Sequence, residues 1–132
     1  MRIAAPLREL VRRRAGERCE YCRISQSADP FFTFHVEHVI ARQHGGATDE
    51  SNLALSCHHC NLHKGPNLTA IDPEDGTVVA AVFHPRSERW DDHFAVEEGV
   101  VRGKTPIGRA TVRLLAMNDA RRVRLRAASL SA

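Results

Sequence analysis

The four cysteines are the residues whose type and spacing point most directly to chemistry. They form two Cys-x-x-Cys pairs, Cys19 with Cys22 and Cys57 with Cys60, and a long stretch of chain separates the two pairs. Each pair can hold two sulfurs around one ion in a tight turn, and two such pairs complete a tetrahedral shell of four thiolates. The spacing therefore predicts a structural Zn²⁺ site that also closes a long loop of the chain.

Three other uses of these residues compete with the zinc interpretation. Two disulfides would need an oxidising compartment, and the first residues of the chain do not resemble a secretory signal. A redox-active Cys-x-x-Cys pair is disfavoured because no parallel βαβ pattern surrounds either pair. His58 and His59 lie inside the second pair, and either could replace one cysteine as a ligand.

A second group of residues lies between Phe34 and Gly65. It reads Phe-His-Val-Glu-His-Val-Ile, then Gly-Gly, then Asn-Leu, then Cys-His-His-Cys-Asn-Leu-His-Lys-Gly. This string resembles the HNH endonuclease family over about residues 19–65. The family pattern is an acid and a His on a first strand, an Asn before a second strand, and a His or Asn on the next helix with a Lys three residues later. The matching positions are Glu37, His38, Asn52, Asn61 and Lys64. With its two Cys-x-x-Cys pairs, the chain is most similar to the zinc-bearing, four-cysteine branch of small stand-alone bacterial members.

The resemblance implies a ββα-metal, treble-clef-like core with a divalent cation between the first strand and the helix. It implies that Glu37 and Asn61 hold Mg²⁺ or Mn²⁺, both of which prefer oxygen ligands. It makes His38 the general base, since imidazole accepts a proton near neutral pH. Asn52 would pin the loop that orients His38, and Lys64 would reach a phosphate oxygen.

The elements that must position these residues follow from hydrophobic periodicity and from helix-start and turn signals. We expect helices over 6–15, over 58–64, from Pro106 to about Asn118 and over 119–130. We expect strands through Phe32, Phe34 and Val36, at Leu53 and Leu55, over 77–83 and within 94–101. Residues 41–52, between the first two strands, should form a loop. This order predicts an α+β fold in which flanking helices surround the zinc-bearing core. We expect one domain over 1–132, with the motif core at about 19–65 and a C-terminal extension of strands and helices at about 77–130.

Composition and charge narrow the function classes. The chain is 42% hydrophobic and 27% charged, which is typical of a soluble globular protein and excludes disordered, collagenous and coiled-coil classes. No apolar stretch is long enough to span a bilayer, so we expect a cytoplasmic protein with no membrane partner. Residues 1–18 carry a net charge of +4 and residues 101–132 carry +7, whereas the middle carries −8.

Basic ends are suited to binding a polyanion, and double-stranded DNA is the expected partner. The expected nucleic-acid contacts are His35, Arg121, Arg122, Arg124 and Arg126. The alternative is that these charged helices simply face water.

The leading hypothesis is a metal-dependent endonuclease that hydrolyses DNA phosphodiester bonds. The alternatives are a non-catalytic, zinc-containing module that binds nucleic acid and a structural protein held together by zinc. The pattern favours neither a monomer nor a homodimer.

Overall fold

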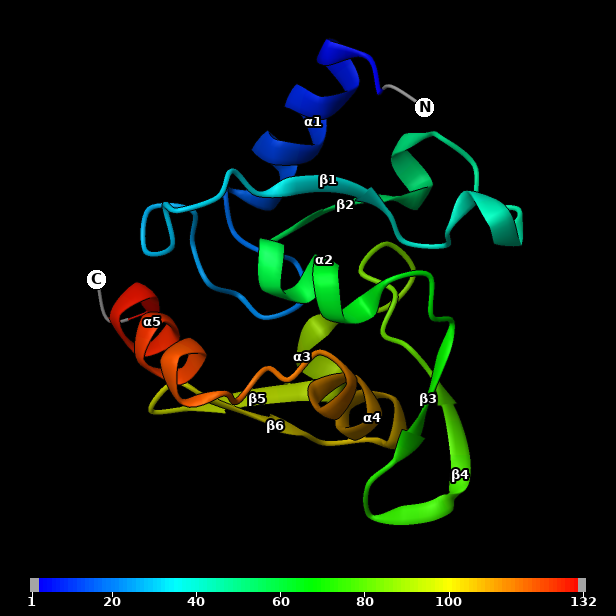
Figure 1. Cartoon of the computed structure of the whole chain (residues 1–132), viewed down its shortest axis with the longest axis vertical. Helices are drawn as coiled ribbons and strands as arrows, with labels where there is room; N and C mark the ends of the chain where they lie inside the picture. Colours follow the sequence, from blue (N-terminus) through cyan, green and yellow to red (C-terminus); the bar gives the residue numbers. More distant parts are fainter. Residues whose placement is uncertain (1–2, 131–132) are drawn as a thin grey trace.

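The computed structural model of the protein describes residues 3–130 and has an α+β fold. Its first half consists of helix α1 (Ala5–Ala15), the antiparallel hairpin β1 (His35–His38) and β2 (Leu53–Ser56), and helix α2 (His58–Lys64). Helix α1 lies on one side of the hairpin and α2 lies on the other (Figure 1). Hairpin and following helix form the ββα arrangement expected from the sequence, so the fold-class prediction is confirmed.

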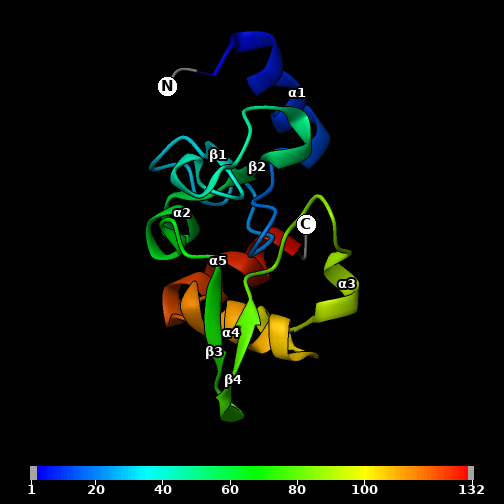
Figure 2. The same cartoon turned by 90° about the vertical axis from the view of Figure 1, so that its right-hand side faces the viewer.

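The second half packs below this core in the view of Figure 1. It consists of β3 (Thr69–Asp72), β4 (Asp75–Ala81), α3 (Trp90–His93), β5 (Phe94–Glu97), β6 (Val100–Gly103), α4 (Pro106–Leu114) and α5 (Ala120–Leu130). Strands β3 and β4 form one antiparallel hairpin and β5 and β6 form another. The β3–β4 hairpin extends away from the body of the molecule, at the end opposite α1 (Figure 2).

Local sequence explains the elements that were predicted well. Pro106 begins α4, and proline is favoured in the first turn of a helix. The Thr105 hydroxyl caps this helix by accepting a hydrogen bond from the Gly108 N–H at 3.0 Å, a common use of threonine at this position. The turn between β5 and β6 falls at Glu98 and Gly99, both with positive φ, as a tight hairpin turn requires.

The structure differs from the expected elements at several places. Strand β1 begins at His35, because the Gln26 side chain accepts a hydrogen bond from the Phe34 N–H at 2.7 Å and holds the preceding residues in a loop. Strand β3 was not expected at all, because among its four residues only Thr69 and Ile71 are strand formers. Helix α4 ends at Leu114 rather than near Asn118, since the chain turns through Ala116, whose φ is 47°.

The core connects the two halves through aromatic side chains. Trp90 packs against Phe94 with ring centroids 4.9 Å apart, and Phe94 meets Phe83 edge to face at 5.1 Å, both favourable arrangements for aromatic pairs. The Trp90 indole N–H donates to the Tyr21 carbonyl at 2.7 Å. Tyr21 lies between the first two cysteines, so this bond ties the second half of the chain directly to the first cysteine pair.

Helix α5 docks through polar and charged side chains as well as through apolar ones. Arg126 is fully buried and donates hydrogen bonds to the backbone carbonyls of Cys22 at 2.7 Å, Gly99 at 2.6 Å and Met117 at 2.5 Å. Arg18, shortly after α1, donates to the Ser129 hydroxyl at 2.8 Å. The bonds to Cys22 and Ser129 span 104 and 111 residues of sequence, and they attach α5 to the segment that carries the first cysteine pair.

Within residues 3–130 there is no helix with the length and apolar character needed to cross a bilayer.

Replacing Arg126 with Met tests how α5 is held. Three buried carbonyls would lose their donor, and each unsatisfied group costs about 1–3 kcal/mol, so the free energy of unfolding should fall by about 3 kcal/mol or more. Arg124→Met is the matched control, since Arg124 is exposed on the same helix, and its effect should stay within about 0.5 kcal/mol. Urea unfolding of zinc-loaded protein measures both. Equal losses in the two variants would contradict the anchoring role.

Candidate metal centre and catalytic site

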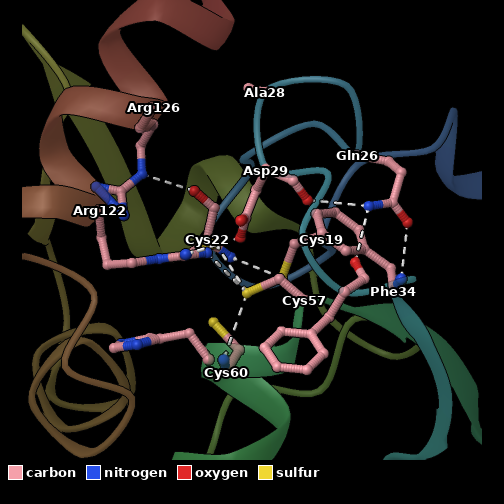
Figure 3. Close-up of polar contacts among 12 residues, drawn as sticks. Cys19, Cys22, Gln26, Ala28, Asp29, Phe34, Cys57, Cys60, Arg122 and Arg126 are labelled. Carbon is pink, nitrogen blue, oxygen red and sulfur yellow. Dashed lines mark hydrogen bonds and ion pairs between the residues drawn. The ribbon is translucent and has the colours of Figure 1, made fainter.

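The four cysteine sulfurs converge in the interior of the protein. Their Sγ atoms lie within 4.8 Å of one another, and all four residues are buried. Cys19 and Cys22 come from the turn after α1, whereas Cys57 and Cys60 come from the start of α2 (Figure 3). The sulfurs of Cys22 and Cys57 are 3.7 Å apart. One ion can reach both of them with Zn–S bonds of about 2.3 Å, so the donor set fits a structural zinc ion.

A backbone N–H group donates to the first sulfur of each cysteine pair. The Cys22 N–H donates to the Cys19 sulfur at 3.4 Å, and the Cys60 N–H donates to the Cys57 sulfur at 3.3 Å. Hydrogen bonds among the cysteines lower the pKa of the Cys22 thiol well below its usual value and raise the pKa of the Cys57 and Cys60 thiols. Both cysteine pairs thus have the same local turn, which is the form that presents two sulfurs to one ion.

Arg122 adds a positive charge to the wall of this centre. Its guanidinium donates to the Cys57 sulfur at 3.2 Å and pairs with the Asp29 carboxylate at 2.7 Å. Burial opposes the charge on Arg122, but the negative charge of Cys57 and the bond to Asp29 outweigh it and raise its pKa. Four thiolates leave an excess of negative charge around Zn²⁺, and Arg122 offsets part of it.

Neither histidine of the second pair joins the cysteine cluster. A ring nitrogen of His58 contacts His35 at 3.1 Å, and the His59 ring N–H donates to the Ala116 carbonyl at 2.9 Å. The four cysteines supply the complete donor set of the cluster within residues 3–130.

Glu37 lies on β1 with its side chain only 10% exposed. Its Oε2 atom is 3.8 Å from the Lys64 ammonium, and its Oε1 atom is buried without a hydrogen bond of normal geometry to any described residue. Burial raises the pKa of Glu37 to about 7, and the charge of Lys64 and the neighbouring Tyr21 hydroxyl oppose that rise. The Tyr21 hydroxyl beside it also lacks a partner of normal geometry, and either that hydroxyl or a bound cation would satisfy the carboxylate oxygen.

Asn61 shares a helix face with Lys64, one turn earlier in α2. Lys64 contacts Glu37, and residues three apart on a helix are neighbours, so Asn61 lies on the side of α2 that faces β1. The residue is half-buried. Glu37 and Asn61 thus offer a carboxylate and an amide oxygen from adjacent elements, a set that fits Mg²⁺ or Mn²⁺.

His38 ends β1 and is half-buried. Its Nε2 atom is 2.8 Å from the Thr48 hydroxyl, which orients the ring. Burial, followed by the nearby charge of Arg42, lowers the pKa of His38. Both effects favour the neutral ring, the form that can accept a proton.

The Asn52 side chain fastens the loop between the two strands. Its Oδ1 accepts from the Ile40 N–H, and its Nδ2 donates to the carbonyls of Ile40 and Ala47, each at 2.9 Å. Gly46 makes this closure possible, because a Cβ there would lie 1.7 Å from the Ile40 carbonyl oxygen. Asn52 thus fixes the chain two residues after His38, at Ile40.

Several predicted nucleic-acid contacts need correction. Lys64 is only 1% exposed and donates to the Val39 carbonyl at 2.7 Å, so its ammonium is turned into the protein and away from any phosphate. Arg122 and Arg126 were expected to contact DNA, but both are buried and bind groups inside the protein, the Asp29 carboxylate and the Cys22 carbonyl respectively. Arg121 and Arg124 are exposed and stay available.

The role of Arg122 at the cysteine cluster was missed from the sequence. The sequence held one signal, since Arg122, Arg126 and Ser129 follow the spacing of one helix face. The structure shows that all three residues are buried. The polar residue types on that face are equally typical of a solvated surface, so the pattern alone did not reveal the contact.

The zinc centre makes a direct prediction. Purified protein should contain one Zn²⁺ per chain, and Cys57→Ser should lose the metal and much of its stability, because structural zinc contributes on the order of 10 kcal/mol to folding. Atomic absorption and thermal melting measure the two effects. Ser56→Ala, at the neighbouring position, is the control that should retain zinc. Full zinc content in Cys57→Ser would contradict the four-thiolate centre.

Asn52→Ala tests the loop closure. Three hydrogen bonds to backbone groups would be lost, and the free energy of unfolding should fall by about 2–3 kcal/mol. Asn67→Ala serves as the control, because Asn67 is exposed and its side chain donates to the Lys64 carbonyl alone among the described groups. Urea unfolding compares the two, and similar small losses would show that Asn52 does not fasten the loop.

Comparison with known proteins agrees with this geometry. The family model described as HNH endonuclease matches residues 19–67, from the first cysteine to just past the end of α2. The searches against curated proteins and against solved structures give no match. The matched segment contains all four cysteines and the hairpin and helix that carry Glu37, His38, Asn52 and Asn61. Residues 19–67 therefore match the HNH endonuclease family model, and the four cysteines in this segment suit a zinc ion.

Proposed function

We propose that the protein is a metal-dependent endonuclease that hydrolyses phosphodiester bonds in double-stranded DNA. The observation that carries this proposal is the buried carboxylate of Glu37, next in sequence to His38, whose ring is oriented by Thr48. A buried carboxylate costs stability, and pairing with Lys64 offsets part of that cost. The HNH domain match supports a nuclease-type function.

His38 is the residue that we assign as general base. Donation from Nε2–H to the Thr48 hydroxyl would leave Nδ1 with the free lone pair. Nδ1 would then accept the proton of the attacking water. The burial that lowers the pKa of His38 favours this neutral form.

Glu37 and Asn61 would hold Mg²⁺ or Mn²⁺, which would neutralise charge on the scissile phosphate and on the departing 3′ oxygen. Lys64 would act from within the protein. Its ammonium faces Glu37 and binds the carbonyl of Val39, the residue after His38, so it would hold the end of β1 in place.

We also propose that residues 1–132 fold as a single domain. The bonds from α5 to Cys22 and from Trp90 to Tyr21 support this, because they make the C-terminal extension part of the same unit as the motif core.

Nicking of supercoiled plasmid tests the proposed reaction. Wild-type protein with Mg²⁺ or Mn²⁺ should nick the plasmid, and His38→Ala should be slower by about 10²–10⁴-fold, the usual contribution of a general base. His44→Ala is the matched control, because His44 lies exposed in the loop that follows His38 and should leave the rate unchanged.

Two results would count against this function. Equal nicking by His38→Ala and wild type would remove His38 as the base. No nicking by zinc-loaded wild type with either cation, together with tight DNA binding, would favour the non-catalytic zinc module instead.

A further inference from the structure

Two phenylalanines are exposed on the loop that precedes β1. Phe31 is 80% exposed and Phe32 is 47% exposed, although large aromatic residues usually contribute to the core. Their rings contact each other edge to face, with centroids 4.9 Å apart. This aromatic pair forms an apolar projection on the surface of the protein.

The aromatic pair is braced by neighbouring side chains. Gln26 donates to the carbonyls of Asp29 and Phe32, each at 3.0 Å, and accepts from the Phe34 N–H (Figure 3). The Phe32 ring stacks on the ring of His58, with centroids 4.0 Å apart and planes inclined by 24°. The loop is therefore held in a defined shape that leaves Phe31 exposed.

The aromatic pair lies next to the proposed catalytic residues. His58 contacts His35 at 3.1 Å, and His35 is on the same face of β1 as Glu37, two residues away. On α2, His58 lies one helical turn before Asn61. The pair is thus linked, through His58 and His35, to the helix and the strand that carry Asn61 and Glu37.

The surroundings of the pair favour a nucleic acid as its partner. A depression of about 270 Å³ beside it is lined by Phe31, Phe32, His58, Leu62 and Arg121, and Arg121 is exposed. Asp29, which also borders the depression, is neutralised by Arg122, so among these lining residues the exposed acid is Asp119. Aromatic rings beside an exposed guanidinium form the combination that stacks on bases and pairs with phosphate.

We propose that Phe31 and Phe32 contact bases of the substrate DNA close to the cleaved phosphate, with Phe31 stacking on or inserting beside a base. Apolar side chains inserted at a base step unstack and kink the duplex. Arg121 would contact a phosphate on the same strand. This inference deepens the proposed function, because the position of the cleaved phosphate rests on it.

Fluorescence anisotropy with a labelled DNA duplex tests this contact. The measurements use full-length, zinc-loaded His38→Ala protein without added Mg²⁺ or Mn²⁺, so that no cutting interferes. Adding Phe31→Ala to this protein should weaken DNA binding about tenfold, as expected for the loss of one base-stacking contact. Adding Phe31→Trp instead should keep the affinity within about twofold of that of the His38→Ala protein. Val79→Ala is the control, since Val79 is 62% exposed on the distant strand β4, and it should leave binding unchanged.

Salt dependence separates stacking from charge. Phe31→Ala should leave the slope of log K against log salt unchanged, whereas Arg121→Ala should reduce that slope by about one. Unchanged binding by Phe31→Ala would overturn the proposal. Loss of self-association in Phe31→Ala, with DNA binding intact, would also overturn it and would assign the pair to contact with a second copy.

The outcomes also distinguish this proposal from the proposed function. Wild-type protein that binds DNA through Phe31 but never nicks plasmid would remove the nuclease function and leave the contact. If wild-type protein nicks plasmid but Phe31→Ala binds DNA normally, the nuclease function stands and the aromatic contact is removed.

Discussion

Convergence of four sulfurs in the interior is the constraint on which the rest of the structure depends. The segment from Cys19 to Cys22 is bonded to several elements. The Glu20 carboxylate accepts a hydrogen bond from the Leu55 N–H of β2. The Tyr21 carbonyl accepts one from Trp90, and the Cys22 carbonyl accepts one from Arg126. The second pair begins α2, the helix that carries Asn61. Holding the sulfurs together therefore places the hairpin, α2 and the C-terminal helix relative to one another.

Sequence patterns predicted the parts of this arrangement that are fixed by short-range chemistry. The Cys-x-x-Cys spacing identified the cysteine cluster, and the Gly-Gly and Asn-Leu steps located the loop that Asn52 closes. Spacing alone could not show that the Lys64 ammonium turns toward Val39, because a lysine on that face can reach the strand or solvent. Alternation also placed Phe32 in a half-buried strand, whereas the bond between Gln26 and Phe34 holds it in an exposed loop.

Arginine serves in this small protein as a binder of backbone carbonyls as much as a surface charge. Arg14 donates to the Leu53 carbonyl at 2.8 Å, Arg12 donates to that of Phe34 at 3.2 Å, and Arg126 engages three carbonyls. The planar guanidinium, with its several donors, suits this use. The +7 charge of residues 101–132 therefore overstates the positive surface available to a polyanion, since Arg122 and Arg126 are buried.

The position of α5, far beyond the metal ligands in the sequence, gives the molecule an order of assembly. All four sulfur ligands lie before residue 61, so the metal-binding half can form during synthesis while α5 is still being made. Arg126 then has to find the Cys22 carbonyl across 104 residues, and contacts of such long sequence separation form slowly. Helix α5 can therefore close over the metal-binding half only after the whole chain has been made, and until then the Cys22 carbonyl lacks its Arg126 donor.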